Sequence, residues 1–110
     1  MAESFQQLTI KKKANVEIGA SLLVVDSLPL DQFCALDYFL CFKKDGLNST
    51  KAFKVLVRKT ETNVEDSVYS RNGTGIDVDF FVNVNGSNVE LQVTNNEAVA
   101  VELTFARTKL

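Results

Sequence analysis

The sequence predicts an all-β fold, either an antiparallel β-sandwich or a jelly-roll-like barrel, with eight or nine short strands. Two observations predict it. Apolar and polar residues alternate with a period of two in segment after segment, and turn-forming residues separate these segments about every ten residues. We expect no helix longer than a turn or two. The strand order, jelly-roll or immunoglobulin-like, stays open.

The clearest element is a hairpin centred on Asn85-Gly86. Apolar residues occupy every second position on both sides of this dipeptide, within residues 76–93. Asn-Gly between two alternating segments is the strongest short-range signal for a β-hairpin. A two-residue turn at Asn85-Gly86 would pair Val82 with Val89 and keep the large apolar side chains on one face. A four-residue loop would keep the same phase.

The same alternation predicts the remaining strands, with turn-forming residues between them. In chain order these strands are residues 5–12, 15–18, 22–25, 33–42, 52–59, 64–70 and 99–105. Pro29 is the only proline, and we expect it to end a strand or begin a turn. The chain is short enough for one domain. We therefore expect an N-terminal strand or arm over residues 1–13 and a single β-sandwich domain over residues 14–110.

Residues 33–42 form the most apolar segment. Periodicity alone also permits a helix, but the aromatic residues and the neighbouring strands favour a central strand that is buried on both faces. If the sandwich covers only one of those faces, the other must meet a partner subunit, which predicts a homo-oligomer. Cys34 and Cys41 would then lie about 23 Å apart and point to opposite sides, so we expect two buried reduced thiols.

Composition and charge exclude several classes of function. The net charge is −2, which argues against broad binding of nucleic acid because that requires a positive surface. No apolar run approaches the roughly 20 residues of a membrane span. The first residues lack the basic start and apolar run of a secretory signal. We expect a protein that binds neither nucleic acid nor membrane.

Catalysis is not expected from these residues. The chain has no histidine, the usual general base near neutral pH, and no base is evident beside either cysteine. Asp77 and Asp79 would suit a carboxylate pair or a calcium ion, but a solvated outer face of the hairpin explains them better. No Gly-rich phosphate loop or Cys/His metal spacing is present. We therefore predict no catalytic residues, no metal site and no cofactor.

Two groups of residues are candidates for contact with a partner. The first lies before the sandwich and either adds a strand to a neighbour or forms an edge strand protected by charge: Phe5, Leu8, Ile10, Lys11, Lys12 and Lys13. The second consists of aromatic residues suited to a subunit contact or to stacking on a sugar: Tyr38, Tyr69 and Phe81.

A succession of short motifs over residues 37–110 carries a resemblance to a known family. The most telling are Leu91-Gln92-Val93-Thr94 and, at the end of the chain, Arg107-Thr108-Lys109-Leu110. Before them come Leu36-Asp37-Tyr38-Phe39-Leu40, Ala52-Phe53-Lys54-Val55-Leu56-Val57, a strand from Val64 to Tyr69, a loop over residues 72–75 and Ile76-Asp77-Val78-Asp79-Phe80. In this arrangement the chain resembles a family of small virion proteins of tailed bacteriophages.

The chain departs from the family pattern in two places. Thr94 is followed by Asn95, where such proteins often have proline, and Asp66-Ser67-Val68-Tyr69 stands where Glu-Tyr-Gly is usual. The family supplies no catalytic residues.

The resemblance implies a β-sandwich or jelly-roll module that is made in the host cytoplasm and ends on the virion. It implies a capsid decoration protein, also called a cement or staple protein, bound to the major capsid protein or to another virion protein. A tail or fibre module is the alternative within the same family. The exposed aromatic candidates keep a further alternative open, a carbohydrate-binding module that recognises a surface glycan.

Overall fold

The fold is an antiparallel β-sandwich, seen in a computed structural model that describes residues 9–110. The described elements are β1 (Thr9–Val16), β2 (Leu23–Pro29), the 3-10 helix η1 (Leu30–Gln32), β3 (Ala35–Lys44), β4 (Thr50–Lys59), β5 (Val64–Asn72), β6 (Val78–Asn85), β7 (Asn88–Asn95) and β8 (Val101–Lys109). The predicted all-β class is therefore confirmed, with eight strands in the described part of the chain.

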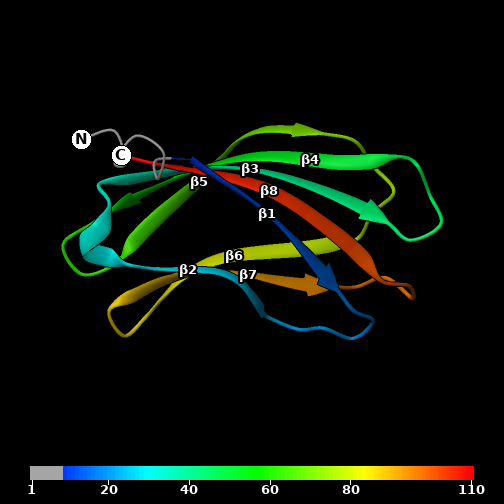
Figure 1. Cartoon of the computed structure of the whole chain (residues 1–110), viewed down its shortest axis with the longest axis horizontal. Helices are drawn as coiled ribbons and strands as arrows, with labels where there is room; N and C mark the ends of the chain where they lie inside the picture. Colours follow the sequence, from blue (N-terminus) through cyan, green and yellow to red (C-terminus); the bar gives the residue numbers. More distant parts are fainter. Residues whose placement is uncertain (1–8) are drawn as a thin grey trace.

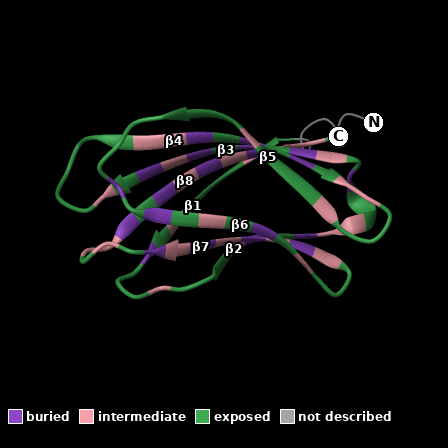
Figure 2. Ribbon diagram, turned by 180° about the vertical axis from the view of Figure 1, so that it is seen from behind, coloured by how far each residue is buried: buried purple, intermediate pink, exposed green. Residues whose placement is uncertain are grey.

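The strands form two layers (Figure 1). Sheet A has five strands in the order β1-β8-β3-β4-β5, and sheet B has three strands in the order β2-β7-β6. All pairings are antiparallel. Figure 2 shows buried residues alternating with exposed ones along the strands, as expected for sheets with one face on the core and one face in water.

Residues 33–42 supply the central strand, as predicted, because β3 lies between β8 and β4. Its inward residues are buried in the core between the sheets: Leu36, Tyr38, Leu40 and Phe42. The expectation of burial on both faces is not met by the described residues. Phe39 on the opposite face is 50% exposed. Cys34 is exposed and Cys41 is half-buried, so the predicted pair of buried thiols is wrong.

The cysteines lie outside the core for a simple reason. Cys41 shares the outward parity of Phe39 on β3, and Cys34 precedes the strand. The sequence of this segment is apolar at both parities, so hydrophobicity alone does not tell which set of side chains faces the core. Both thiols are free rather than joined in a disulfide.

The β6–β7 hairpin forms, but its register differs from the predicted one by two residues. Val84 pairs with Val89, Val82 with Leu91, and Asn85 with Asn88. The two-residue turn is therefore Gly86-Ser87 rather than Asn85-Gly86. Gly86 has φ +62°, and a glycine at the first central position is what a type II′ turn requires. The even shift keeps all apolar side chains on the core face.

The first described strand ends further along the chain than predicted, at Val16 rather than at residue 12. β1 pairs with β8 over its whole length and runs across the predicted boundary at residue 13. The segment predicted as a strand over residues 15–18 divides between the end of β1 and a turn. Phe5 and Leu8 lie outside the described residues. Pro29 ends β2, as predicted.

Asn95 joins the end of β7 to neighbouring loops. It is 5% exposed, and its side-chain Nδ2 donates to the carbonyl oxygens of Val16 and Val99 at 3.0 Å each. Its backbone N–H donates to the carbonyl of Ala20 at 2.9 Å. Proline has neither donor, so Asn95 makes contacts that a proline at this position could not make.

Candidate functional site

The outward side of sheet A carries large apolar side chains in the part of the chain that the structure describes. Phe39 on β3 is 50% exposed, Leu56 on β4 is 47% exposed, and Tyr69 on β5 is 53% exposed. Cys41 and Ala106 lie half-buried on the same side, next to Phe39. We call this surface the Phe39 face: Phe39, Cys41, Leu56, Tyr69, Ala106, Lys11 and Lys54. Contiguous exposed apolar surface of this kind marks interaction sites.

Tyr69 reaches this surface through an irregularity in β5. The register between β4 and β5 shifts between Lys54 and Val55, which leaves Tyr69 without a direct partner. Bulges of this type redirect a side chain. The Tyr69 hydroxyl donates to Oδ1 of Asp37 at 2.8 Å. This hydrogen bond is the main cause of a raised pKa for the Tyr69 hydroxyl. The ring is therefore held in place on the surface.

Phe39 stands at the centre of the Phe39 face. It lies opposite Ala106 on one side and Lys54 on the other, and Lys11 lies opposite Ala106 one strand further out. The Lys54 ammonium lies 5.2 Å from the centre of the Phe39 ring. Shallow hollows flank the ring on both sides, one lined by Lys11, Cys41 and Ala106, the other by Ala52, Lys54 and Ser70. A partner side chain can therefore contact both sides of the ring.

The charge on this side of sheet A is mainly basic, although the whole chain is mildly acidic. Lys13 pairs with Glu102 at 3.9 Å, and Arg58 pairs with Glu65. Among the described residues, Lys11 and Lys54 have no carboxylate partner. The centre of the Phe39 face is therefore an apolar surface with Lys11 and Lys54 beside it and one carboxylate, Asp37, which accepts the Tyr69 hydroxyl.

The outward side of sheet B is different in kind. Phe81 on β6 is 43% exposed and stands among amides and carboxylates. No lysine or arginine occurs in β2, β6 or β7. We call this surface the Phe81 face: Asp79, Phe81, Asn83, Asn85, Glu90 and Gln92. It is mainly polar and its charged groups are all acidic, and the exposed Val24 of β2 lies opposite Gln92 at its border.

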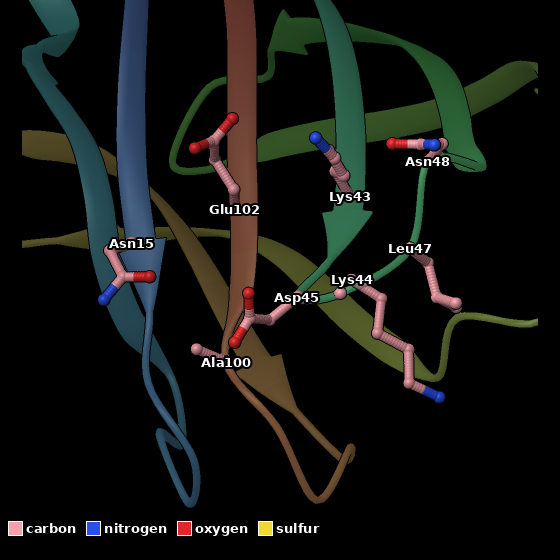
Figure 3. Close-up of a pocket in the computed structure, with 9 residues that line it drawn as sticks. Asn15, Lys43, Lys44, Asp45, Leu47, Asn48, Ala100 and Glu102 are labelled. Carbon is pink, nitrogen blue, oxygen red and sulfur yellow. The ribbon is translucent and has the colours of Figure 1, made fainter.

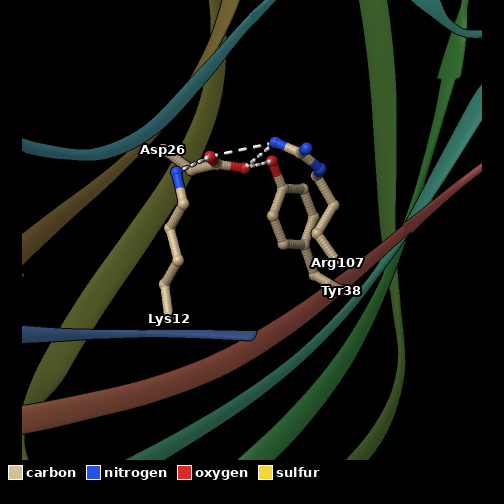
Figure 4. Close-up of polar contacts among 4 residues, drawn as sticks. All are labelled: Lys12, Asp26, Tyr38 and Arg107. Carbon is tan, nitrogen blue, oxygen red and sulfur yellow. Dashed lines mark hydrogen bonds and ion pairs between the residues drawn. The ribbon is translucent and has the colours of Figure 1, made fainter. Parts of the chain in front are cut away.

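A buried ionic cluster joins the two sheets (Figure 4). Asp26 on β2 is 3% exposed, and its carboxylate accepts from Arg107 Nη1 at 2.8 and 3.0 Å and from the Tyr38 hydroxyl at 2.7 Å. Lys12 approaches the same carboxylate at 3.6 Å. Burial, and then the neighbouring Asp26, raise the pKa of Tyr38 well above its usual value. Paired with opposite charge on the other sheet, Asp26 serves to hold the layers together.

A polar hollow lies at one end of sheet A (Figure 3). Asn15, Glu102 and Lys43 line it from three adjacent strands, and the turn after β3 completes it. Its lining contains no aromatic residue. Lys43 and Glu102 are cross-strand neighbours. The hollow is a solvated sheet end, and we assign it no chemistry.

The structure separates the residues predicted to contact a partner. Lys11 and Tyr69 lie on the Phe39 face, with Lys13 on the same side of sheet A, whereas Phe81 lies on the opposite surface of the molecule. Ile10 is half-buried and Lys12 points inward to Asp26. Tyr38 is a correction: at 1% exposure it belongs to the core, because its position on β3 has inward parity.

Sequence reasoning missed Phe39 and Leu56 as surface residues. The available signal was weak. Each of the two residues lies opposite a charged residue on the neighbouring strand, Phe39 opposite Lys54 and Leu56 opposite Asp37. It also missed the Asp26–Arg107 pair, whose partners are 81 residues apart. No local pattern links such distant residues.

Comparisons with known proteins give little further information. No family model matches the chain, and no curated protein matches its sequence. A structural neighbour is the crystal structure of the Acinetobacter baumannii phage AM24 tailspike protein, with a TM-score of 0.49 and 11% sequence identity. The match covers 93% of this chain and 26% of the tailspike chain, so the chain spans about a quarter of that protein's length. A likeness this distant carries no inference about function.

Two features of residues 9–110 concern membranes and metal ions. No helix there is long and apolar enough to cross a membrane. No group of three or more acidic or cysteine side chains there is placed to hold a metal ion.

Proposed function

We propose that the chain is a phage virion structural protein that acts by binding another virion protein through the Phe39 face. The resemblance of residues 37–110 to small tailed-phage virion proteins supports the virion role. The observation that carries the docking surface is Phe39 itself, an aromatic side chain at the centre of a sheet that is half exposed. Leu56 and Tyr69 extend the apolar surface beside it.

The charges define the chemistry of the partner. Because Lys11 and Lys54 flank Phe39 without carboxylate partners, the complementary surface has an apolar centre bordered by acidic residues. A two-fold contact between copies through this face would bring like charges together. We therefore expect the partner at this face to be a different protein with an acidic surface. Self-association of the chain, predicted from the apolar strand, stays a prediction that analytical ultracentrifugation would test.

The size of the surface is sufficient for a specific contact. Strands spaced about 4.8 Å apart and rising about 3.3 Å per residue give sheet A an outer surface of about 700 Å². A standard interface takes about 600–1,000 Å² from each partner, so the contact would use most of this side of sheet A. The apolar part, at about 25 cal/mol per Å² buried, stabilises the contact, and many copies on one shell would resist its internal pressure together.

Decoration of the capsid is the specific role that we propose, and a tail or fibre module is the second candidate. Both use the same surface, so copy number separates them. Quantitative mass spectrometry of purified particles that contain the chain measures its ratio to the major capsid protein. A decoration protein is expected in proportion to capsid subunits. A few copies per particle would favour the tail or fibre role instead.

The docking surface is tested with matched variants on the two sides of the molecule. Phe39→Asp places a charge at the centre of the proposed contact, and Phe81→Asp places the same charge on the opposite surface. Purified chain is mixed with particles that lack it, and the fraction that co-sediments is measured. We expect Phe39→Asp to lose binding and Phe81→Asp to keep it. Equal binding by Phe39→Asp and the unmodified chain would contradict the proposal.

A further inference from the structure

The Phe81 face is organised around one exposed aromatic ring. Phe81 lies opposite Gln92 of β7, and Asp79 and Asn83 flank it along β6. Its 43% exposure is unusual for a position in the middle of a hairpin strand whose neighbours on that face are all polar. An aromatic face surrounded by hydrogen-bonding groups offers two kinds of contact at one place.

The amides and carboxylate beside Phe81 hold one another in position. Asn83 Nδ2 donates to Gln92 Oε1 at 3.0 Å, and Gln92 Nε2 donates to Glu90 Oε1 at 3.2 Å. Asn85 Nδ2 donates to Glu90 Oε2 at 3.3 Å. Each amide group keeps further donors or acceptors for a ligand, since an amide carries two N–H groups and two lone pairs. The surface is therefore ordered before any ligand binds, which lowers the entropic cost of binding.

The absence of positive charge restricts the ligand. β2, β6 and β7 contain no lysine or arginine, whereas Asp79 and Glu90 are both on this face. Phosphate, sulfate and carboxylate groups are therefore repelled. An apolar protein surface would cover the amide groups without replacing their water, which is unfavourable. A ligand with many neutral hydroxyl groups and one apolar surface satisfies both the amides and the ring.

We propose that the Phe81 face binds a neutral glycan. The C–H side of a hexose ring stacks on Phe81, and its hydroxyl groups exchange hydrogen bonds with Asn83, Glu90 and Gln92. This site lies on the side of the sandwich opposite the Phe39 face. It does not depend on the proposed docking function, and both sites can be occupied at the same time.

The test uses the full chain displayed in many copies on beads, because multivalent display makes weak single-site binding measurable. The beads are applied to an array of neutral hexose and N-acetylhexosamine oligosaccharides, with sialylated and sulfated glycans as the acidic set. We expect binding within the neutral set only. The affinity for the best neutral oligosaccharide is then measured by titration calorimetry for the unmodified chain and three variants.

Phe81→Ala is expected to reduce that affinity about tenfold, as loss of one aromatic contact does, and Gln92→Ala is expected to reduce it as well. Phe39→Ala, on the other face, is the matched control and is expected to bind like the unmodified chain. Circular dichroism confirms that each variant remains folded.

Three results would overturn the proposal. The first is an array with no binding to neutral glycans. The second is binding that survives both Phe81→Ala and Gln92→Ala, or that is lost equally in Phe39→Ala. The third is a change in sedimentation of the chain caused by Phe81→Ala, with no glycan binding, which would assign this face to contact between copies.

Discussion

The two outer surfaces of the sandwich arise from the same alternation of residues but differ in charge and chemistry. The outward side of sheet A combines Phe39, Leu56 and Tyr69 with unpaired lysines. The outward side of sheet B surrounds Phe81 with amides and carboxylates and has no basic residue. An exposed aromatic residue is therefore expected to contact a different class of partner on each surface. The neighbouring charges, more than the ring, indicate the class of partner.

The separation of the two surfaces depends on the ionic cluster between the sheets. Asp26, Tyr38 and Arg107 are all buried, and each comes from a different strand. Arg107 Nε has no hydrogen-bond partner among the described residues. A buried pair of this kind costs much solvation, so it contributes less to net stability than its geometry suggests. Loss of one partner alone, however, leaves the other charge buried without compensation.

The largest expected effect follows from breaking this cluster. Asp26→Ala leaves Arg107 buried and unpaired, and we expect the free energy of unfolding to fall by about 3–5 kcal/mol. Urea denaturation followed by circular dichroism measures it. The double variant Asp26→Ala with Arg107→Met removes both charges and is the control, and it should recover a large part of the loss. A change below about 1 kcal/mol in the single variant would show that the cluster does not join the sheets.

The next effect concerns alkaline pH. The pKa of Tyr38 is raised by burial and by Asp26, so the folded protein keeps the phenol proton that the unfolded chain loses above about pH 10. Stability from this group is complete below that pH and decreases as pH rises, by about 1.4 kcal/mol per pH unit.

Tyr38→Phe is the matched control for this titration, since it keeps the ring and removes the ionisable group. The unmodified chain is expected to lose stability more steeply than Tyr38→Phe between about pH 10 and pH 11, measured by urea denaturation. Parallel curves for the two proteins would contradict the assignment.

The surface variants Phe39→Asp and Phe81→Asp should affect stability less. Their effects on binding decide whether the two outer surfaces have different partners. Phe39→Asp and Phe81→Asp each change an exposed side chain, so the free energy of unfolding should change by about 0.5 kcal/mol or less. Their effects on binding should be opposite: the first loses particle binding, and the second loses glycan binding. If either variant loses both activities while remaining folded, the two surfaces are not independent.

The smallest expected effect is the response to salt. Docking through the Phe39 face involves Lys11 and Lys54, so it should weaken as sodium chloride is added. The screening length for exposed charges is about 10 Å at 0.1 M salt and becomes shorter at higher concentrations. Glycan binding at the Phe81 face involves no ion pair and should change little over the same range. Co-sedimentation and calorimetry at several salt concentrations measure the two responses. If glycan binding depended on salt more steeply than particle binding, the assignment of charged contacts to the Phe39 face would be contradicted.

The fold could be predicted from sequence because its signals are local. The alternation that predicts β6 and β7 is present in the residues of those strands, and the even shift of the hairpin turn kept the same side chains inward. The turn itself was misplaced because Asn85-Gly86 and Gly86-Ser87 both suit two-residue turns. Each offers glycine a position with positive φ.

The candidate surfaces could be predicted only in part. Tyr69 and Phe81 were identified as candidate contacts, but the assignment of Phe39 and Tyr38 to opposite sides of β3 required the structure, since both parities of that strand are apolar. The placement of Tyr38 depends on Asp26 and Arg107, which meet only after the sheets pack. Long-range contacts of this kind leave no pattern in a single sequence.

The most direct test of the central claim is side-chain footprinting of the chain on the particle. Hydroxyl radicals oxidise exposed aromatic and aliphatic side chains, and mass spectrometry compares their oxidation in the free chain and in the particle-bound chain. We predict that Phe39, Leu56 and Tyr69 become protected on the particle while Phe81 is oxidised at its free rate. Protection of Phe81 with unchanged oxidation of Phe39 would contradict it.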